Sequence, residues 1–194
     1  MEKINFIKTF IPQGDFREKY EHGGMIVRHL AAVLDEKMGA YECYECTVPI
    51  GEYDEGEIQK AFIDFTSKMD ALKLKQAKVE KIAEITAYDT SSAVNSFILN
   101  GVPRWLNLDK RQSIAYSAKI LKEKGHDSIT IWFDTDKVVL PIDDAISLLD
   151  TLEVYAKTTN NVTHEHMLTV DCLSDIEEVH NFDVTAGYPR KVDY

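Results

Sequence analysis

The segment Ser128-Ile-Thr-Ile-Trp-Phe-Asp-Thr-Asp-Lys-Val-Val-Leu-Pro141 decides the fold class, because it places two short strands directly before a helix. Residues 128–133 and 137–140 are rich in β-branched and aromatic residues, and Asp134-Thr-Asp136 supplies the turn between them. Pro141 then opens a long helix, since the first helical position does not need a backbone N–H. The apolar face of that helix consists of Ile142, Ala145, Ile146, Leu149, Leu152, Val154 and Tyr155.

A second hairpin precedes this segment. Asn100-Gly101 is the strongest short hairpin signal in the chain, because both residues tolerate a positive φ. It joins a strand at Val94–Leu99 to a strand at Val102–Leu106, and Pro103 predicts that the latter is an edge strand. The sequence therefore predicts two hairpins in this half.

Cap residues place the helices around these hairpins. Asn107 or Asp109 caps a helix that runs to Lys124 and ends at Gly125. The long helix after Pro141 either continues to about Leu173 or breaks near Asn160-Asn161. Ser174-Asp-Ile-Glu177 is a capping box that predicts a last short helix.

The N-terminal part reads as a small antiparallel β unit. Strands are expected at Ile4–Ile11, Met25–Leu34 and Ala40–Ile50, separated by a polar stretch at residues 13–24 and a turn at 35–39. The last strand alternates imperfectly, so the pattern leaves open which of its faces is buried.

A long helix is predicted at residues 55–85, with Asp54 as its N-cap and Glu57 three residues later. Its apolar residues include a seven-residue repeat, which favours either packing on the β unit or a coiled coil with a second copy. The repeat consists of Ile58, Phe65, Leu72 and Val79. A basic face is interpreted as solvated, and it comprises Lys68, Lys73, Lys75, Lys78 and Lys81.

Together these elements predict an α+β protein in two domains. Residues 1–85 form a small antiparallel β unit and a long helix, and residues 86–194 form a compact domain of two β-hairpins and about three helices.

Charge and apolar content limit the classes of partner. The net charge is −11 over 194 residues, with a similar acidic excess in both halves. A phosphate backbone or an anionic membrane surface binds clustered Lys and Arg, so we expect neither nucleic acid nor membrane as a partner. We expect no signal peptide, and the low cysteine count indicates reduced thiols made in a cytoplasm.

Candidate chemical sites have simpler structural interpretations. Cys43-x-x-Cys46 has the spacing of half a zinc site, and a four-ligand site with His164 and His166 is an alternative to structural cysteines and surface histidines. The adjacent acids Asp143-Asp144 and Glu177-Glu178 stand at predicted helix starts, where negative charge is favourable. We therefore expect no catalytic residue, metal or cofactor.

Several segments, taken in order, resemble a family of phage and prophage proteins of unknown function. They are Ala87–Phe97, Leu99-Asn-Gly-Val-Pro-Arg-Trp-Leu106, Ile131-Trp-Phe133, Leu152–Ala156 and Phe182-Asp-Val-Thr-Ala-Gly-Tyr-Pro189. Members of that family are found among tail, baseplate and tail-fibre genes, and many end in Tyr-Asp-x-Thr-x-Gly-Tyr-Pro, where this chain has Phe182 in the first place. The resemblance covers residues 85–194, and it points to a structural motif made by Asn100, Gly101, Trp105, Trp132, Asp183, Gly187, Tyr188 and Pro189.

The resemblance implies a virion role without a reaction. The expected function is a non-enzymatic structural component of a bacteriophage tail, baseplate or tail fibre, made in the host cytoplasm, and an assembly chaperone is the alternative. Its expected partners are other tail or fibre proteins and further copies of the chain. Trp105, Trp132 and Tyr188 are expected first as core residues and second as interface anchors. Gly187 is expected to need a backbone angle that other residues resist.

Overall fold

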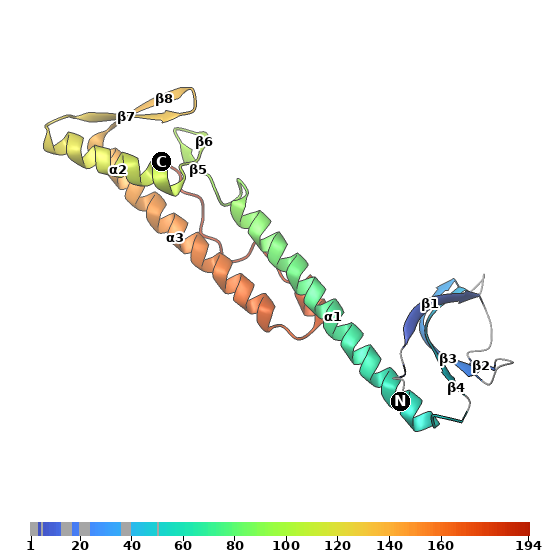
Figure 1. Ribbon diagram of the computed structural model, residues 1–194. Coiled ribbons are helices and arrows are strands. Elements are labelled where there is room, and N and C mark those ends of the chain that lie inside the picture. Colours follow the sequence, from blue (N-terminus) through green and yellow to red (C-terminus); the bar gives the residue numbers. More distant parts are fainter. Residues whose placement is uncertain (1–3, 5, 13–16, 20–23, 36–39, 50) are drawn as a thin grey trace. The chain divides into compact units, whose positions relative to one another are not determined.

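The computed structural model describes residues 4, 6–12, 17–19, 24–35, 40–49 and 51–194. The chain divides into two compact units, Met1–Lys73 and Leu74–Tyr194, so the division falls within the long helix, whereas the sequence placed it at residue 85. Both units combine helices with antiparallel strands, which confirms the predicted α+β class (Figure 1). No described helix has an apolar stretch long enough to cross a membrane.

The first unit contains a four-stranded antiparallel sheet in the order β1-β4-β3-β2. Its strands are β1 (Ile7–Pro12), β2 (Arg17–Lys19), β3 (Gly24–Asp35) and β4 (Ala40–Pro49). The three predicted strands are confirmed, whereas β2 lies in the stretch that we interpreted as a polar connection. Three residues with charged side chains carry too little apolar pattern to announce a strand.

The core of this unit covers the face of β4 that carries Cys46 and Val48, although Cys43 on the other face is buried as well. Cys46 and Val48 pack with Phe6, Val27 and Ile58 in one apolar cluster. The Phe6 ring lies 5.3 Å from the Phe62 ring of the long helix, edge to face. The β unit therefore packs on the first turns of that helix, one of the two arrangements that its apolar repeat allowed.

The long helix α1 spans Glu55–Thr90. The predicted capping box is confirmed, because the Glu57 N–H donates to Asp54 Oδ1 at 2.8 Å and the Asp54 N–H donates to Glu57 Oε2 at 3.0 Å. The seven-residue repeat does not follow one buried face, since Leu72 and Val79 are 60% and 54% exposed. In the second unit the buried positions of α1 are instead Ala77, Lys81 and Ile85.

The second unit contains two hairpins and three further helices (Figure 1). Its elements are β5 (Phe97–Leu99), β6 (Val102–Arg104), α2 (Leu108–Glu123), β7 (Ser128–Phe133), β8 (Asp136–Pro141), α3 (Ile142–Cys172) and α4 (Ile176–His180). Asn107 rather than Asp109 caps α2, because its side chain accepts a hydrogen bond from the Lys110 N–H at 2.9 Å. Helix α3 continues through Asn160-Asn161 without a break.

The last helix corrects one predicted cap. Asp175, not Ser174, is the N-cap of α4, since its Oδ1 accepts hydrogen bonds from the N–H groups of Glu177 and Glu178 at 2.7 and 3.0 Å. Both residue types are good caps, so the sequence alone allowed either. The predicted N-cap is therefore displaced by one residue.

The main core of the second unit lies under both hairpins. It is built from Phe97, Leu99, Leu106, Ala118, Ile129, Ile131, Phe133, Leu140, Ile142, Ala145, Leu148, Leu149 and Leu152. A smaller core lies between α1, α3, α4 and the segment that follows α4. It consists of Ala77, Ile85, Val170, Val179 and Val184.

Candidate interaction surface

The β7–β8 hairpin has one buried and one exposed face. Ile129, Ile131 and Phe133 are buried, and the residues between them are exposed. Trp132 is 59% exposed and Val139 is 54% exposed. They lie on the same face as diagonal neighbours, because Trp132 pairs with Lys137 and Thr130 pairs with Val139.

The expectation that Trp132 fills the core is therefore wrong. Side chains alternate between the faces of a strand, so burying Ile129, Ile131 and Phe133 necessarily turns Trp132 outward. The face thus presents two exposed apolar side chains, with Lys137 directly opposite Trp132. The second interpretation of Trp132, as an interface anchor, stays a prediction.

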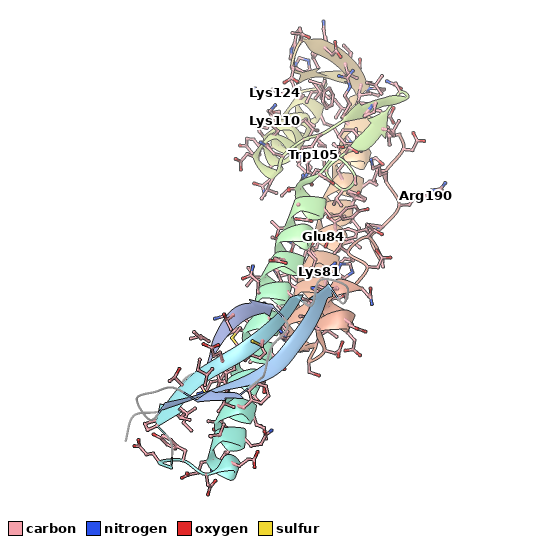
Figure 2. The ribbon with its side chains drawn as sticks, turned by 90° about the vertical axis from the view of Figure 1, so that its right-hand side faces the viewer. Lys81, Glu84, Trp105, Lys110, Lys124 and Arg190 are labelled. Carbon is pink, nitrogen blue, oxygen red and sulfur yellow. The ribbon has the colours of Figure 1, made fainter. Side chains whose placement is uncertain are left out.

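Trp105 packs against the main core, as expected. The Arg111 guanidinium lies 5.5 Å from the centre of its ring, and Arg111 also donates to the Leu106 carbonyl oxygen at 2.7 Å and to Glu153 Oε2 at 3.1 Å. Arg111 is 6% exposed, so these acceptors stabilise a buried charge. No sequence signal distinguished this buried arginine from the exposed lysines of the same helix. One of those lysines, Lys110, is labelled in Figure 2.

A small pocket lies beside Trp105. It measures about 210 Å³ and is lined by Pro103, Arg104, Trp105, Lys110, Phe133 and Asp134. The Arg104 guanidinium lies 5.1 Å from the centre of the Phe133 ring and is paired with Asp136 at 2.7 Å. The lining holds cations, a carboxylate and aromatic rings, and it includes no serine, cysteine or histidine that could serve as a nucleophile or its base.

The Asn100-Gly101 turn is confirmed and carries a further contact. Its φ angles are +53° and +77°, which is typical of a type I′ turn. The Ile98 N–H donates to the Val192 carbonyl oxygen at 2.8 Å, and the Tyr194 N–H donates to the Ile98 carbonyl oxygen at 3.0 Å. Residues 192–194 therefore lie beside β5 as a short parallel strand, and β6 is left at the edge that Pro103 predicted.

The Phe182–Pro189 segment lies across α1 and α3. Tyr188 packs edge to face on Tyr88 and on His166, with ring centres 5.2 and 5.6 Å apart. Its hydroxyl lies 2.8 Å from that of Thr163, which in turn donates to Asp89 Oδ1 at 2.8 Å. Burial, together with the Asp89 carboxylate, raises the pKa of Tyr188.

Two other residues of this segment shape its backbone. Gly187 has a φ of +75°, as expected. Asp183 Oδ1 accepts hydrogen bonds from the Thr185 hydroxyl and N–H at 2.7 and 2.9 Å, and these bonds hold the pKa of Asp183 below its usual value. Pro189 follows Tyr188 and is half-buried. The motif residues of this segment thus shape one stretch of chain, whereas Asn100 and Gly101 form the β5–β6 turn and Trp105 packs on the main core.

The basic face of α1 is only partly solvated, which corrects its interpretation. Lys81 is 9% exposed and donates to the carbonyl oxygens of His180 and Phe182 at 3.1 and 3.4 Å. It also pairs with Glu84 at 2.7 Å, and Figure 2 shows both side chains on α1. Lys78 donates to the Asp171 carbonyl oxygen. These acceptors lie where α3 and α4 end, where a cation interacts favourably with the helix dipole.

The two cysteines are buried, whereas His164 is exposed and His166 is half-buried. Cys43 and Cys46 are buried, and burial followed by the Glu45 charge raises the pKa of Cys46 to about 11. His164 Nδ1 lies 2.8 Å from the Asn160 carbonyl oxygen, and the His166 ring lies 5.1 Å from the Phe182 ring. Within each unit, the described residues hold no group of three or more side chains that could ligate a metal ion.

Comparisons with known proteins found no matching family model, no matching curated protein and no matching solved structure.

Proposed function

We propose that this chain is a non-enzymatic structural component of a bacteriophage tail, baseplate or tail fibre. The proposal starts from the resemblance of residues 85–194 to tail-associated phage proteins. The observation that carries it furthest is the exposed pair Trp132 and Val139 on a hairpin whose other face is anchored in the main core. A rigid element that presents apolar side chains suits an assembly subunit.

The chemistry of the motif supports a structural role. The Tyr188 and Thr163 hydroxyl groups and the Asp89 carboxylate form hydrogen bonds that connect α1, α3 and the C-terminal segment. The Asp183 carboxylate binds the Thr185 next to it. In this proposal the motif therefore fixes the shape of the unit, and the exposed hairpin face makes the contact with other proteins.

The proposed partners are other tail or fibre proteins and further copies of this chain. The net charge of −11 disfavours contact with nucleic acid or with an anionic membrane. We place the protein in the virion tail after synthesis in the host cytoplasm.

An assembly chaperone is the second candidate, because the same apolar face would also suit transient binding to an unassembled fibre or tail protein. The two candidates differ in where the protein is found after assembly. A subunit stays in the particle, and a chaperone leaves it.

Quantitative mass spectrometry of purified phage particles tests the proposal, with a lysate of the same infection as the control. A structural subunit is expected in the particles at an integral copy number that survives high-salt washing. Detection in the lysate alone would exclude the subunit and favour the chaperone. Absence of the protein from both phage samples would contradict both candidates.

A further inference from the structure

The pocket beside Trp105 lies where three parts of the second unit meet. Its wall comes from the end of β6, the first turn of α2 and the turn between β7 and β8. Figure 2 labels two of its lining residues, Trp105 and Lys110. The volume of about 210 Å³ is below the ~300–1,000 Å³ of pockets that take drug-sized ligands, so this pocket suits one small molecule.

The charges of the lining cancel, which disfavours an ionic ligand. The Arg104 guanidinium is paired with Asp136 at 2.7 Å. The other two charged side chains of the lining, Lys110 and Asp134, are exposed and have opposite signs. Neither forms an ion pair within the part of the chain that the structure describes. A fully charged ligand would be attracted by one of them and repelled by the other, so a neutral ligand fits better.

The same side chains offer both kinds of hydrogen-bonding group. A carboxylate only accepts hydrogen bonds, whereas guanidinium and ammonium groups only donate them. Arg104 also has a buried Nε that lacks a hydrogen-bond partner among the described residues, and an unused buried donor is costly. Because a hydroxyl group both donates and accepts, a ligand with several hydroxyl groups can use the acidic and the basic side chains of the pocket together.

Apolar rings form the rest of the wall, and they come from Pro103, Trp105 and Phe133. Trp105 is half-buried, and the Arg111 guanidinium over its ring helps to hold it in place. The C–H groups of a sugar ring are apolar and pack on aromatic rings, while its hydroxyl groups turn toward polar partners. Rings next to both donors and acceptors therefore match a sugar better than they match a purely apolar ligand.

We propose that this pocket binds one neutral sugar ring. In this assignment the Asp134 carboxylate accepts hydrogen bonds from sugar hydroxyl groups, Lys110 and Arg104 donate to others, and Trp105 contacts the C–H groups. The proposal goes beyond the structural role and concerns the purified chain alone. Its experiment and the analysis of phage particles can therefore fail independently.

Two-dimensional ¹⁵N NMR of the full chain tests the proposal, because its two tryptophans give two indole N–H signals. Trp132→Phe assigns them, and Trp132 lies outside the pocket lining. Glucose, galactose, mannose and N-acetylglucosamine are titrated separately. At least one is expected to move the Trp105 signal saturably, with a Kd on the order of 1–10 mM for so small a ligand, and to leave the Trp132 signal in place.

Sodium acetate and ammonium chloride serve as charged probes in the same titration. We expect neither to produce a saturable movement of the Trp105 signal. The proposal would be overturned if none of the four sugars moved that signal, if a sugar moved both indole signals equally, or if a charged probe acted where the sugars did not.

Two variants test whether the sugar occupies this pocket. Asp134→Gly removes the acceptor and suits the φ of +54° at this position, and it is expected to weaken binding at least about tenfold. Lys110→Met removes a donor and is expected to weaken binding by about threefold or more. Lys119→Met is the matched control, because Lys119 is exposed on the same helix outside the lining, and it is expected to bind like wild type.

Unchanged binding in both pocket variants would place the sugar elsewhere and overturn the assignment. The dispersion of the backbone signals in the same spectra identifies a variant that has lost its fold, and the other variant then decides the result.

Discussion

The hydroxyl groups of Tyr188 and Thr163 lie 2.8 Å apart, and this contact connects the C-terminal segment to the middle of α3. The Thr163 hydroxyl also donates a hydrogen bond to Asp89, near the end of α1. Three parts of the second unit thus meet at one threonine.

Tyr188→Phe should remove this connection and keep the ring packing. We expect the free energy of unfolding to fall by about 0.5–1.5 kcal/mol, the usual contribution of one hydrogen bond. Urea unfolding measures it. Tyr116→Phe is the control, because Tyr116 is 69% exposed on α2. Equal stability of Tyr188→Phe and wild type would show that water replaces the bond at no cost.

Gly187→Val should destabilise the second unit through its backbone. Gly187 has a φ of +75°, and an added Cβ would meet Val162 Cγ1 at an ordinary 3.8 Å, so the cost comes from conformation rather than from a clash. We expect a loss of at least ~1–2 kcal/mol. Gly187→Asn should cost less, because asparagine tolerates this region better. An unchanged melting temperature in the valine variant would contradict the argument.

Lys81→Met should loosen the end of α4. The substitution keeps the apolar stem of the side chain but removes the donor to His180 and Phe182, and bonds to charged groups contribute ~1.5–3 kcal/mol. Amide hydrogen exchange of residues 176–184 is expected to accelerate. Lys68→Met, on an exposed position of α1, is expected to leave that exchange unchanged. Similar exchange in both variants would mean that Lys81 fills space without holding the carbonyl groups.

Substitutions at two neighbouring residues of β7 should change the stability by very different amounts. Phe133→Ala removes a ring that is 8% exposed and should cost about 3–5 kcal/mol. Trp132→Ser changes an exposed side chain and should stay within ~0.5 kcal/mol of wild type. Thermal unfolding compares the two, and a large loss for Trp132→Ser would show that its ring is covered in solution.

The rate of thiol labelling should distinguish the exposed Cys172 from the buried Cys46. Cys172 is exposed and should react quickly near pH 8, whereas Cys46 should react only after unfolding. Because the pKa of Cys46 is raised from 9.0 to about 11, its contribution to stability is complete below pH 9 and is lost as the pH rises through 11. Fast labelling of a second thiol in the folded protein at pH 8 would disprove the burial.

Local signals predicted most of the elements. Asn100-Gly101, the Asp54–Glu57 box and Gly125 each act within a few residues, so the sequence alone placed one turn, one helix start and one helix end. The predicted hairpins, the unbroken option for α3 and the angle of Gly187 all agree with the structure.

The missed features depend on residues far apart in the chain. Alternation shows that Ile131 and Trp132 face opposite ways, but only the core beneath the hairpin decides which of them is buried. Lys81 looked like one more surface lysine, because its carbonyl acceptors stand about a hundred positions later. A lysine in the same helical stripe as Ala77 and Ile85 was the one available hint.

The short strand at residues 192–194 has a consequence for the order of folding. It lies on the edge of β5 opposite β6, so that contact cannot form until nearly the whole unit has been synthesised. Contacts between such distant residues form slowly, because a long loop must close first. Until then β5 has an unpaired edge next to a hydrophobic core, and unpaired strand edges favour aggregation.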